Sequence, residues 1–252
     1  MYGARAIESR ITTPRVLSAL ELLLGGAIVI GHNVFHVVPN EVPILFVLAL
    51  LSFFLRDGGL TATEAVSPAS WSGSLLLVWR RLRSGLVALG FRRPASWTRL
   101  LLIALVAAGV RIFAGDYLIV PFAERWWPPP AAPEDVQDIT GDAGTALFYL
   151  GIVWTFAAFG EEIGYRGYLL TRAADVGRRS TAAYLVAVVI TAILFGYGHY
   201  YKGMSGVIDS GFAGLVLGAA YLAAGRNLWA SILAHGFIDT VAVGLAFMGL
   251  DS

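Results

Sequence analysis

Residues 143–173 read AGTALFYLGIVWTFAAFGEEIGYRGYLLTRA, an apolar run that is interrupted near its centre by two adjacent glutamates and an arginine. The run is longer than the roughly 20 residues that an α-helix needs to cross a bilayer. The whole chain has a similar character, because 57% of its residues are hydrophobic, 14% are charged and the mean hydropathy is +0.71. This composition is unusual for a soluble domain. It predicts an all-α, polytopic integral membrane protein built as a helix bundle.

Apolar runs elsewhere in the chain predict about seven transmembrane helices in total. We place them near residues 16–38, 40–55, 100–122, 143–173, 182–200, 206–224 and 228–249. The run at 40–55 is short for a full crossing, so a tilted, re-entrant or hairpin arrangement stays open for it. The glycine-rich stretch GFAGLVLGAA within 206–224 predicts a close approach between two helices.

The placement of arginines predicts the orientation, because loops rich in Arg and Lys stay in the cytoplasm. One set precedes the first span, a second lies between the second and third spans, and a third follows the fourth span. The sets are Arg5, Arg10 and Arg15; Arg56, Arg80, Arg81, Arg83, Arg92, Arg93 and Arg99; and Arg172, Arg178 and Arg179. We expect all three sets, and the N-terminus, on the cytoplasmic side of a bacterial inner membrane.

The connecting segments have distinct compositions. Residues 57–74 are rich in Gly, Ser, Thr and Ala and predict a loop. Residues 75–93 alternate apolar residues with arginines and predict a helix that lies on the membrane surface. The proline-rich loop around residues 124–142 has only one arginine and is expected on the outer side.

Several kinds of chemistry are excluded or made improbable by composition. The chain has no cysteine, which excludes disulfides, thiolate nucleophiles and cysteine-ligated zinc. A formal net charge of +1 gives no indication of nucleic-acid binding. No HExxH sequence occurs, so the common zinc-protease helix is also excluded.

The glutamates at 161 and 162 call for a functional explanation. A charged residue at the middle of a membrane helix costs roughly 2.5–3.5 kcal/mol on insertion scales. Glu162 and Arg166 are four residues apart in the order that favours an ion pair on one helix. Glu161 points about 100° away and has no basic residue three or four positions later. It is the unpaired carboxylate, suited to proton transfer, although both acids serving only as packing contacts is the alternative.

Two later spans carry polar pairs of their own. Phe195 and His199 lie four apart near the end of the fifth span, and His235 and Asp239 lie four apart in the seventh. A single intramembrane histidine can simply bond a backbone carbonyl. Three helices that each deliver a polar pair, however, supply the parts for activating a water molecule.

Other polar residues receive simpler interpretations. His32 and His36 lie beside the end of the first span at a spacing compatible with metal binding, and we interpret them as interfacial, with metal binding as the alternative. Arg111 and Asp116 are five residues apart, which is poor for pairing. We expect Arg111 to extend towards the membrane surface or to mark a bend.

Taken in order, EEIGYR at 161–166, FGYGH at 195–199 and HGFID at 235–239 match the patterns EExxxR, FxxxH and HxxxN/D. Over about residues 143–243 the chain therefore resembles the CPBP family of intramembrane proteases, which groups CAAX prenyl endopeptidases with bacteriocin-processing or Abi proteins. The resemblance implies an all-helical membrane fold and peptide-bond hydrolysis. We expect one membrane domain over residues 1–252, with helices and loops without motifs in 1–142 and a CPBP-like catalytic core in 143–249.

The family pattern implies catalytic roles for Glu161, His199, His235 and Asp239, and supporting roles for Glu162, Arg166 and Phe195. In that pattern Glu161 and His199 hold and activate the attacking water, and the third motif steadies the oxyanion. Asp239 departs from the Asn of CAAX-type members. Because an ionised Asp would repel an oxyanion, Asp239 must be protonated, orient His235 or bind a cation; we favour orientation of His235.

We expect an intramembrane endopeptidase that cleaves a membrane-associated protein or peptide, with the lipid bilayer as its surroundings and no nucleic-acid partner. No metal cofactor is expected. Zinc held by Glu161, His199 and His235 is the alternative. The competing functions are a non-catalytic scaffold that stabilises a membrane partner, and a proton-coupled carrier, since such residues also form proton relays.

Overall fold

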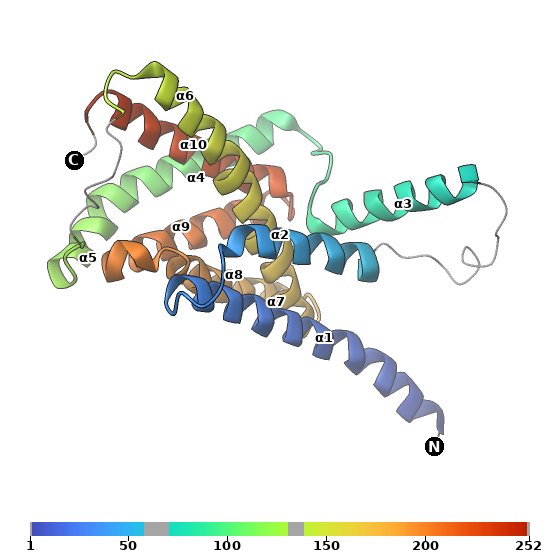
Figure 1. The fold of residues 1–252 in the computed structure, drawn as a ribbon. Helices are drawn as coiled ribbons and strands as arrows, with labels where there is room; N and C mark the ends of the chain where they lie inside the picture. The colour runs from blue at the N-terminus through green and yellow to red at the C-terminus, as the bar shows by residue number, and fades with distance from the viewer. Residues whose placement is uncertain (1, 58–70, 131–138, 251–252) are drawn as a thin grey trace.

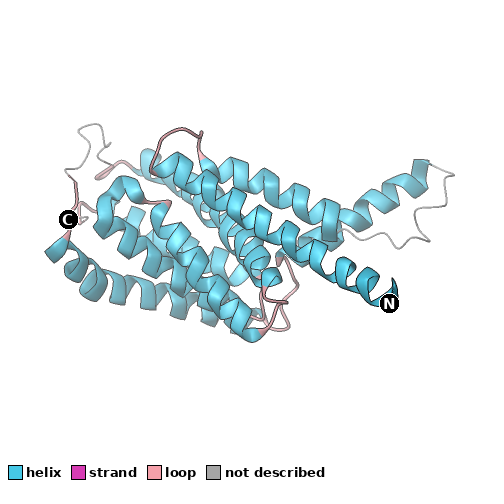
Figure 2. Ribbon diagram, turned by 90° about the horizontal axis from the view of Figure 1, so that it is seen from below, coloured by secondary structure: helices cyan, strands magenta, loops and turns pink. Residues whose placement is uncertain are grey.

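The structure is a computed structural model that describes residues 2–57, 71–130 and 139–250. Every regular element among these residues is helical, which confirms the predicted all-α class (Figures 1 and 2). The α-helices are α1 (Tyr2–Asn33), α2 (Glu41–Ser52), α3 (Trp71–Leu89), α4 (Trp97–Ala114), α5 (Val120–Trp126), α6 (Ala143–Ile152), α7 (Leu170–Val176), α8 (Thr181–Tyr197), α9 (Gly203–Ala223) and α10 (Leu228–Phe247). Shorter π-helical segments are η1 (Phe53–Asp57), η3 (Gly115–Ile119), η4 (Val153–Glu161) and η5 (Ile163–Leu169), and η6 (Tyr200–Lys202) is a 3₁₀ turn.

Five helical stretches among the described residues are long and apolar enough to cross a membrane. They are Arg15–Asn33, Trp97–Trp126, Ala143–Val176, Tyr200–Ala223 and Leu228–Phe247. Helix α8 is apolar but has only 17 residues, and the short run at 40–55 is not among the five. The protein is thus an integral membrane helix bundle, while the count of seven spans is not confirmed.

The glutamates lie within one long helical stretch that runs from Ala143 to Val176. It starts at Asp142, whose carboxylate accepts hydrogen bonds from the backbone N–H groups of Gly144 and Thr145. Its middle is π-helical, with Glu161 as the last residue of η4 and η5 beginning at Ile163. Short π-helical segments occur frequently at functional sites, and the α-helical spacing assumed from the sequence did not anticipate this one.

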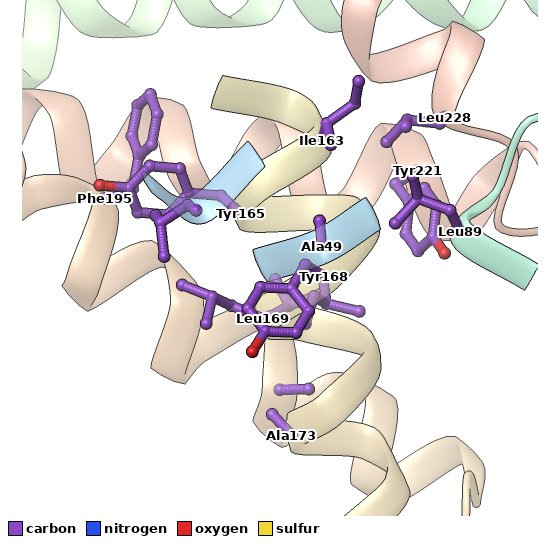
Figure 3. Packing of buried hydrophobic residues seen from close by; sticks show 14 of the residues in the cluster. Ala49, Leu89, Ile163, Tyr165, Tyr168, Leu169, Ala173, Phe195, Tyr221 and Leu228 are labelled. Atoms are coloured by element: carbon purple, nitrogen blue, oxygen red, sulfur yellow. The ribbon is translucent and has the colours of Figure 1, made fainter. Parts of the chain in front are cut away.

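Segment η5 lies at the centre of the hydrophobic core, because every residue from Ile163 to Leu169 is buried. Apolar side chains from several other helices surround it (Figure 3). They include Ala49 of α2, Leu89 of α3, Phe195 of α8, Tyr221 of α9 and Leu228 of α10. The two glutamates therefore stand at the edge of the buried core.

Helices α8 and α9 pack closely, as the glycine-rich stretch predicted. A Cβ atom added at Gly214 would lie 2.8 Å from the Cα of Ala192, and one added at Gly218 would lie 2.8 Å from a methyl carbon of Val188. Larger residues at these two positions of α9 would push the helices apart. The close packing brings the backbone of α9 within reach of side chains on η5.

Arginines that were assigned to the same side of the membrane meet at one end of the fold. Arg15 donates two hydrogen bonds to the carbonyl of Val176, at 2.9 and 2.7 Å. Arg172, which is buried, bonds the side chains of Glu21 at 3.0 Å, Ser52 at 2.7 Å and Asp175 at 3.0 Å, and Arg56 also pairs with Glu21. These contacts join α1, the end of α2 with η1, and α7. The side chains of Arg5 and Arg10 lie outside the described residues.

The environment of Arg111 corrects the expectation from sequence. Its guanidinium donates to Asp209 of α9 at 2.6 Å and lies 3.6 Å from Asp116, and its side chain is only 12% exposed. The guanidinium group is therefore held against α9 by an ion pair. The spacing argument against Asp116 assumed a continuous α-helix, whereas Asp116 lies in the π-helical η3 that follows α4. The predicted change in the helix near Arg111 is present.

Helix α3 covers most of the segment predicted to lie on the membrane surface, and it extends away from the main bundle (Figure 1). It contacts η1, since a Cβ added at Gly85 would lie 3.3 Å from the carbonyl oxygen of Phe53. The predicted loop at 57–74 falls largely on residues 58–70, outside the described residues, and its last residues belong to α3. Residues 131–138 of the proline-rich loop also lie outside them.

Candidate active site

Glu162 and Arg166 form a buried ion pair inside the bundle. Nη1 of Arg166 lies 2.7 Å from Oε1 of Glu162, and the two side chains are 1% and 0% exposed. Nη2 donates to the carbonyl oxygen of Gly214 at 3.3 Å, and the guanidinium carbon lies 4.3 Å from the centre of the Phe195 ring, a cation–π contact. The pair predicted from the four-residue spacing is confirmed. It also ties η5 to α8 and α9.

His235 shares the same carboxylate. Its Nδ1 lies 2.9 Å from Oε1 of Glu162, and because an ionised carboxylate only accepts hydrogen bonds, Nδ1 carries the hydrogen. Its Nε2 faces Oδ2 of Asp239 at 3.5 Å. The imidazole of α10 is thus held between two carboxylates. Oε2 of Glu162 is buried and has no partner within the described part of the chain.

His199 is fixed by a backbone carbonyl. It follows α8 in a non-helical conformation, and its Nδ1 lies 2.9 Å from the carbonyl oxygen of Phe195. Since a carbonyl oxygen can only accept, Nδ1 carries the hydrogen, and Nε2 of the neutral ring carries the lone pair. The bond to a carbonyl is the simple contact anticipated for a single histidine. It also selects the tautomer whose Nε2 can accept a proton.

Phe195 lies where the three motifs meet. Its ring centre is 4.8 Å from that of His199 and 6.0 Å from that of His235. The ring of Tyr165 packs edge-on against it at 5.0 Å, and Figure 3 shows these two rings together. An apolar ring that touches both histidines and Arg166 fixes their relative positions.

Glu161 has fewer contacts than its neighbour. Its Oε2 is buried and has no hydrogen-bond partner among the residues that the structure describes. It interacts electrostatically with His235, Glu162, Asp239 and Arg166. This agrees with the expectation of an unpaired carboxylate beside the other motifs, while its catalytic role stays a prediction.

A further carboxylate near the site was not anticipated from the sequence. Glu41, the first residue of α2, is 6% exposed and lies 3.3 Å from Nε2 of His32. A Cβ added at Gly198 would lie 2.6 Å from the hydroxyl of Tyr165 and 3.6 Å from Oε1 of Glu41. The N-terminal region therefore places an acid next to the residue that precedes His199. An acidic residue in the first turn is common in helices, which is why Glu41 gave no signal.

Metal binding at either of the two candidate sets requires that their donor groups lie close together. Nδ1 of His32 bonds the carbonyl of Val38, and its other nitrogen faces Glu41 rather than His36. Among the described residues no group of three or more His, Asp or Glu side chains is placed to hold a metal ion. Glu161, His199 and His235 are thus not gathered as a ligand set, and the absence of a cofactor stays a prediction.

Comparison with known proteins gives one match. Residues 143–241 match the family model described as type II CAAX prenyl endopeptidase Rce1-like. The matched region begins with the long helix and includes all three motifs. No curated protein and no solved structure matches the chain.

Proposed function

We propose that this chain, whose residues 143–241 match the family model described as type II CAAX prenyl endopeptidase Rce1-like, is a membrane endopeptidase of that type and hydrolyses its substrate with a water molecule activated by Glu161 and His199. The observation that carries this proposal is the fixed tautomer of His199. Its Nδ1 donates to Phe195, so that Nε2 offers a lone pair. Glu161 offers a buried carboxylate oxygen that no described residue occupies.

Nε2 of His199 and the carboxylate of Glu161 each accept one hydrogen of the same water molecule. One hydrogen of the water bonds to Nε2 of His199, and the other is transferred to Glu161 as the oxygen attacks the peptide carbonyl. The attack breaks the carbonyl π bond and forms a tetrahedral oxyanion. When the oxyanion collapses, the C–N bond breaks and Glu161 returns its proton to the leaving nitrogen. Glu161 thus ends as it began.

His235 is suited to stabilise the oxyanion, and Asp239 favours the protonated form of His235 that does so. Glu162 accepts from Nδ1 of His235 at 2.9 Å, while Asp239 lies 3.5 Å from Nε2, too far for a good hydrogen bond. A negative Asp239 favours a proton on Nε2. That proton is then available to the developing oxyanion, as an oxyanion hole requires. Asp239 orients and polarises His235 without donating itself.

Replacing Asp239 with asparagine is therefore expected to lower the cleavage rate about 10- to 100-fold, the effect of losing one charge-assisted interaction. The rate is measured on a peptide that spans the cleavage site. Asp116→Asn, a change at a 54% exposed aspartate, is the matched control and should keep the wild-type rate. An unchanged or raised rate in Asp239→Asn would show that the negative charge at this position is not required.

The arginine-rich end of the fold supports a proposal for the orientation in the membrane. Arg15, Arg56 and Arg172 meet there, and the positive-inside rule puts such an end in the cytoplasm. We accordingly place the N-terminal end on the cytoplasmic side of a bacterial inner membrane. The substrate class we propose is a membrane-associated protein or peptide that reaches the site between helices.

The test of this function is a comparison of peptide ends in membranes. Cells carry the wild-type chain, its Glu161→Gln form or the control Glu124→Gln, at equal abundance, and new N- and C-termini are mapped by mass spectrometry. We expect a set of ends that appears with the wild type and the control and is absent with Glu161→Gln. If no ends depend on Glu161 while that variant still supports the wild-type phenotype, the protein acts as a scaffold instead.

A further inference from the structure

An elongated cavity lies between α4 and α9, outside the three motifs. It consists of two adjoining parts, which share Arg99, Ile103 and Ala223 in their walls. The part at the start of α4 has a volume of about 260 Å³. The part further along the two helices has a volume of about 450 Å³.

The two parts differ in chemistry. The smaller part is lined by Arg99 and Ser96, by other residues of the segment 94–103 and by residues 222–225. The larger part is a groove with apolar walls, formed by Leu102, Val106 and Val110 of α4 and by Val216, Ala219, Ala220 and Ala223 of α9. The groove exists because the alanines of α9 are too short to fill the space beside α4. A ligand for the whole cavity would need a polar end and an apolar tail.

The cavity also matches the membrane in depth. Arg99 is the third residue of the membrane-spanning stretch that begins at Trp97, an exposed tryptophan of the kind found at membrane surfaces. From Arg99 to Val110 the helix rises about 16 Å, close to half of the roughly 30 Å hydrocarbon core. The groove therefore runs from the headgroup level to about the middle of the bilayer.

Positive charge is available at the polar end. Arg99 is exposed, and no described residue pairs with its guanidinium group. Helix α4 is 18 residues long and starts here, and the side chain of Ser96 accepts a hydrogen bond from the N–H of Arg99. The N–H groups of Trp97 and Thr98, in the first turn of the helix, favour an anion beside them.

We propose that this cavity binds one anionic phospholipid, with its phosphate against Arg99 and the first turn of α4 and one acyl chain along the groove. The charge at the polar end selects an anionic headgroup over a zwitterionic one. The apolar groove of one leaflet's depth holds a single acyl chain. The lipid would brace α4 against α9, the helices that Arg111 and Asp209 join further along.

Native mass spectrometry of the delipidated full-length protein tests this proposal. The protein is exposed to micelles that contain phosphatidylglycerol or phosphatidylcholine, and the lipid that remains bound is counted. We expect one retained phosphatidylglycerol and little phosphatidylcholine. Since one arginine near a membrane surface contributes about a fivefold preference for anionic lipid, Arg99→Gln should lower phosphatidylglycerol retention about fivefold. The control Arg83→Gln, at an exposed arginine of α3, should leave it unchanged.

A second variant tests the contribution of the groove independently of the charge of Arg99. Ala219→Trp fills the groove from an exposed position of α9, and it should lower retention while Arg99 is intact; Leu105→Trp, on α4 outside the groove, should not. Thermal unfolding of each variant establishes that it is folded. Equal retention of both lipids, no effect of Arg99→Gln or of Ala219→Trp, or a dimer in place of the bound lipid would overturn the proposal.

Discussion

Replacing Arg166 with methionine is expected to destabilise the protein by about 3–5 kcal/mol, the cost of leaving a buried carboxylate without its cation. Glu162 is 0% exposed, and Arg166 gives Oε1 its charged partner at 2.7 Å. Methionine keeps most of the length and the apolar contact with Phe195, but it removes the charge and the bond to Gly214. His235 alone then faces the buried carboxylate.

The free energy of unfolding, measured by denaturant titration in mixed micelles, checks this expectation. Arg83→Met, at an exposed arginine of α3, is the control for loss of a positive charge. Combining Arg166→Met with Glu162→Gln should recover part of the loss, because the unpaired charge is then gone. If Arg166→Met lowers the free energy of unfolding by less than about 1 kcal/mol, the Glu162–Arg166 pair is not needed to hold η5 in place.

Replacing His199 with alanine is expected to lower the cleavage rate by about 10²- to 10⁴-fold, the usual contribution of a group that transfers or holds a proton. The substitution removes Nε2, whose lone pair is set by the bond from Nδ1 to the carbonyl of Phe195. Little loss of stability is expected, since His199 is only partly buried and lies beyond the end of α8.

The rate is measured with a peptide that spans a mapped cleavage site, alongside thermal unfolding of the same preparations. His36→Ala, at an exposed histidine outside the three motifs, is the matched control and should keep the wild-type rate. Activity of His199→Ala within tenfold of the wild type would contradict a role for this histidine in activating water.

What the sequence predicted well are contacts within one helix. The pair Glu162–Arg166 follows from a spacing of four residues, and the helix that carries it fixes both positions. The same reasoning placed His235 and Asp239 on one face of α10. Arg15, Arg56 and Arg172, one from each set assigned to the cytoplasmic side, also lie together at one end of the fold.

Contacts between helices were not predictable in this way. The bond from His235 to Glu162 joins residues 73 positions apart, and the pair Arg111–Asp209 joins residues 98 apart. Each depends on how two helices are rotated and docked, which composition and spacing leave open. The π-helical segments compound the difficulty, since they change which residues share a face. Glu41 gave no signal because an acidic residue in the first turn of a helix is common.

The shared carboxylate of Glu162 has a consequence for the order of events during synthesis. Its oxygen joins Arg166, made early in the matched region, to His235 in α10, the final helix of the described chain. A nascent chain that has inserted only as far as α9 holds the glutamates and His199 but lacks the imidazole that completes the proposed centre. Proteolytic competence would then arise only with docking of the last helix, so that an unfinished chain cannot cleave its neighbours in the membrane.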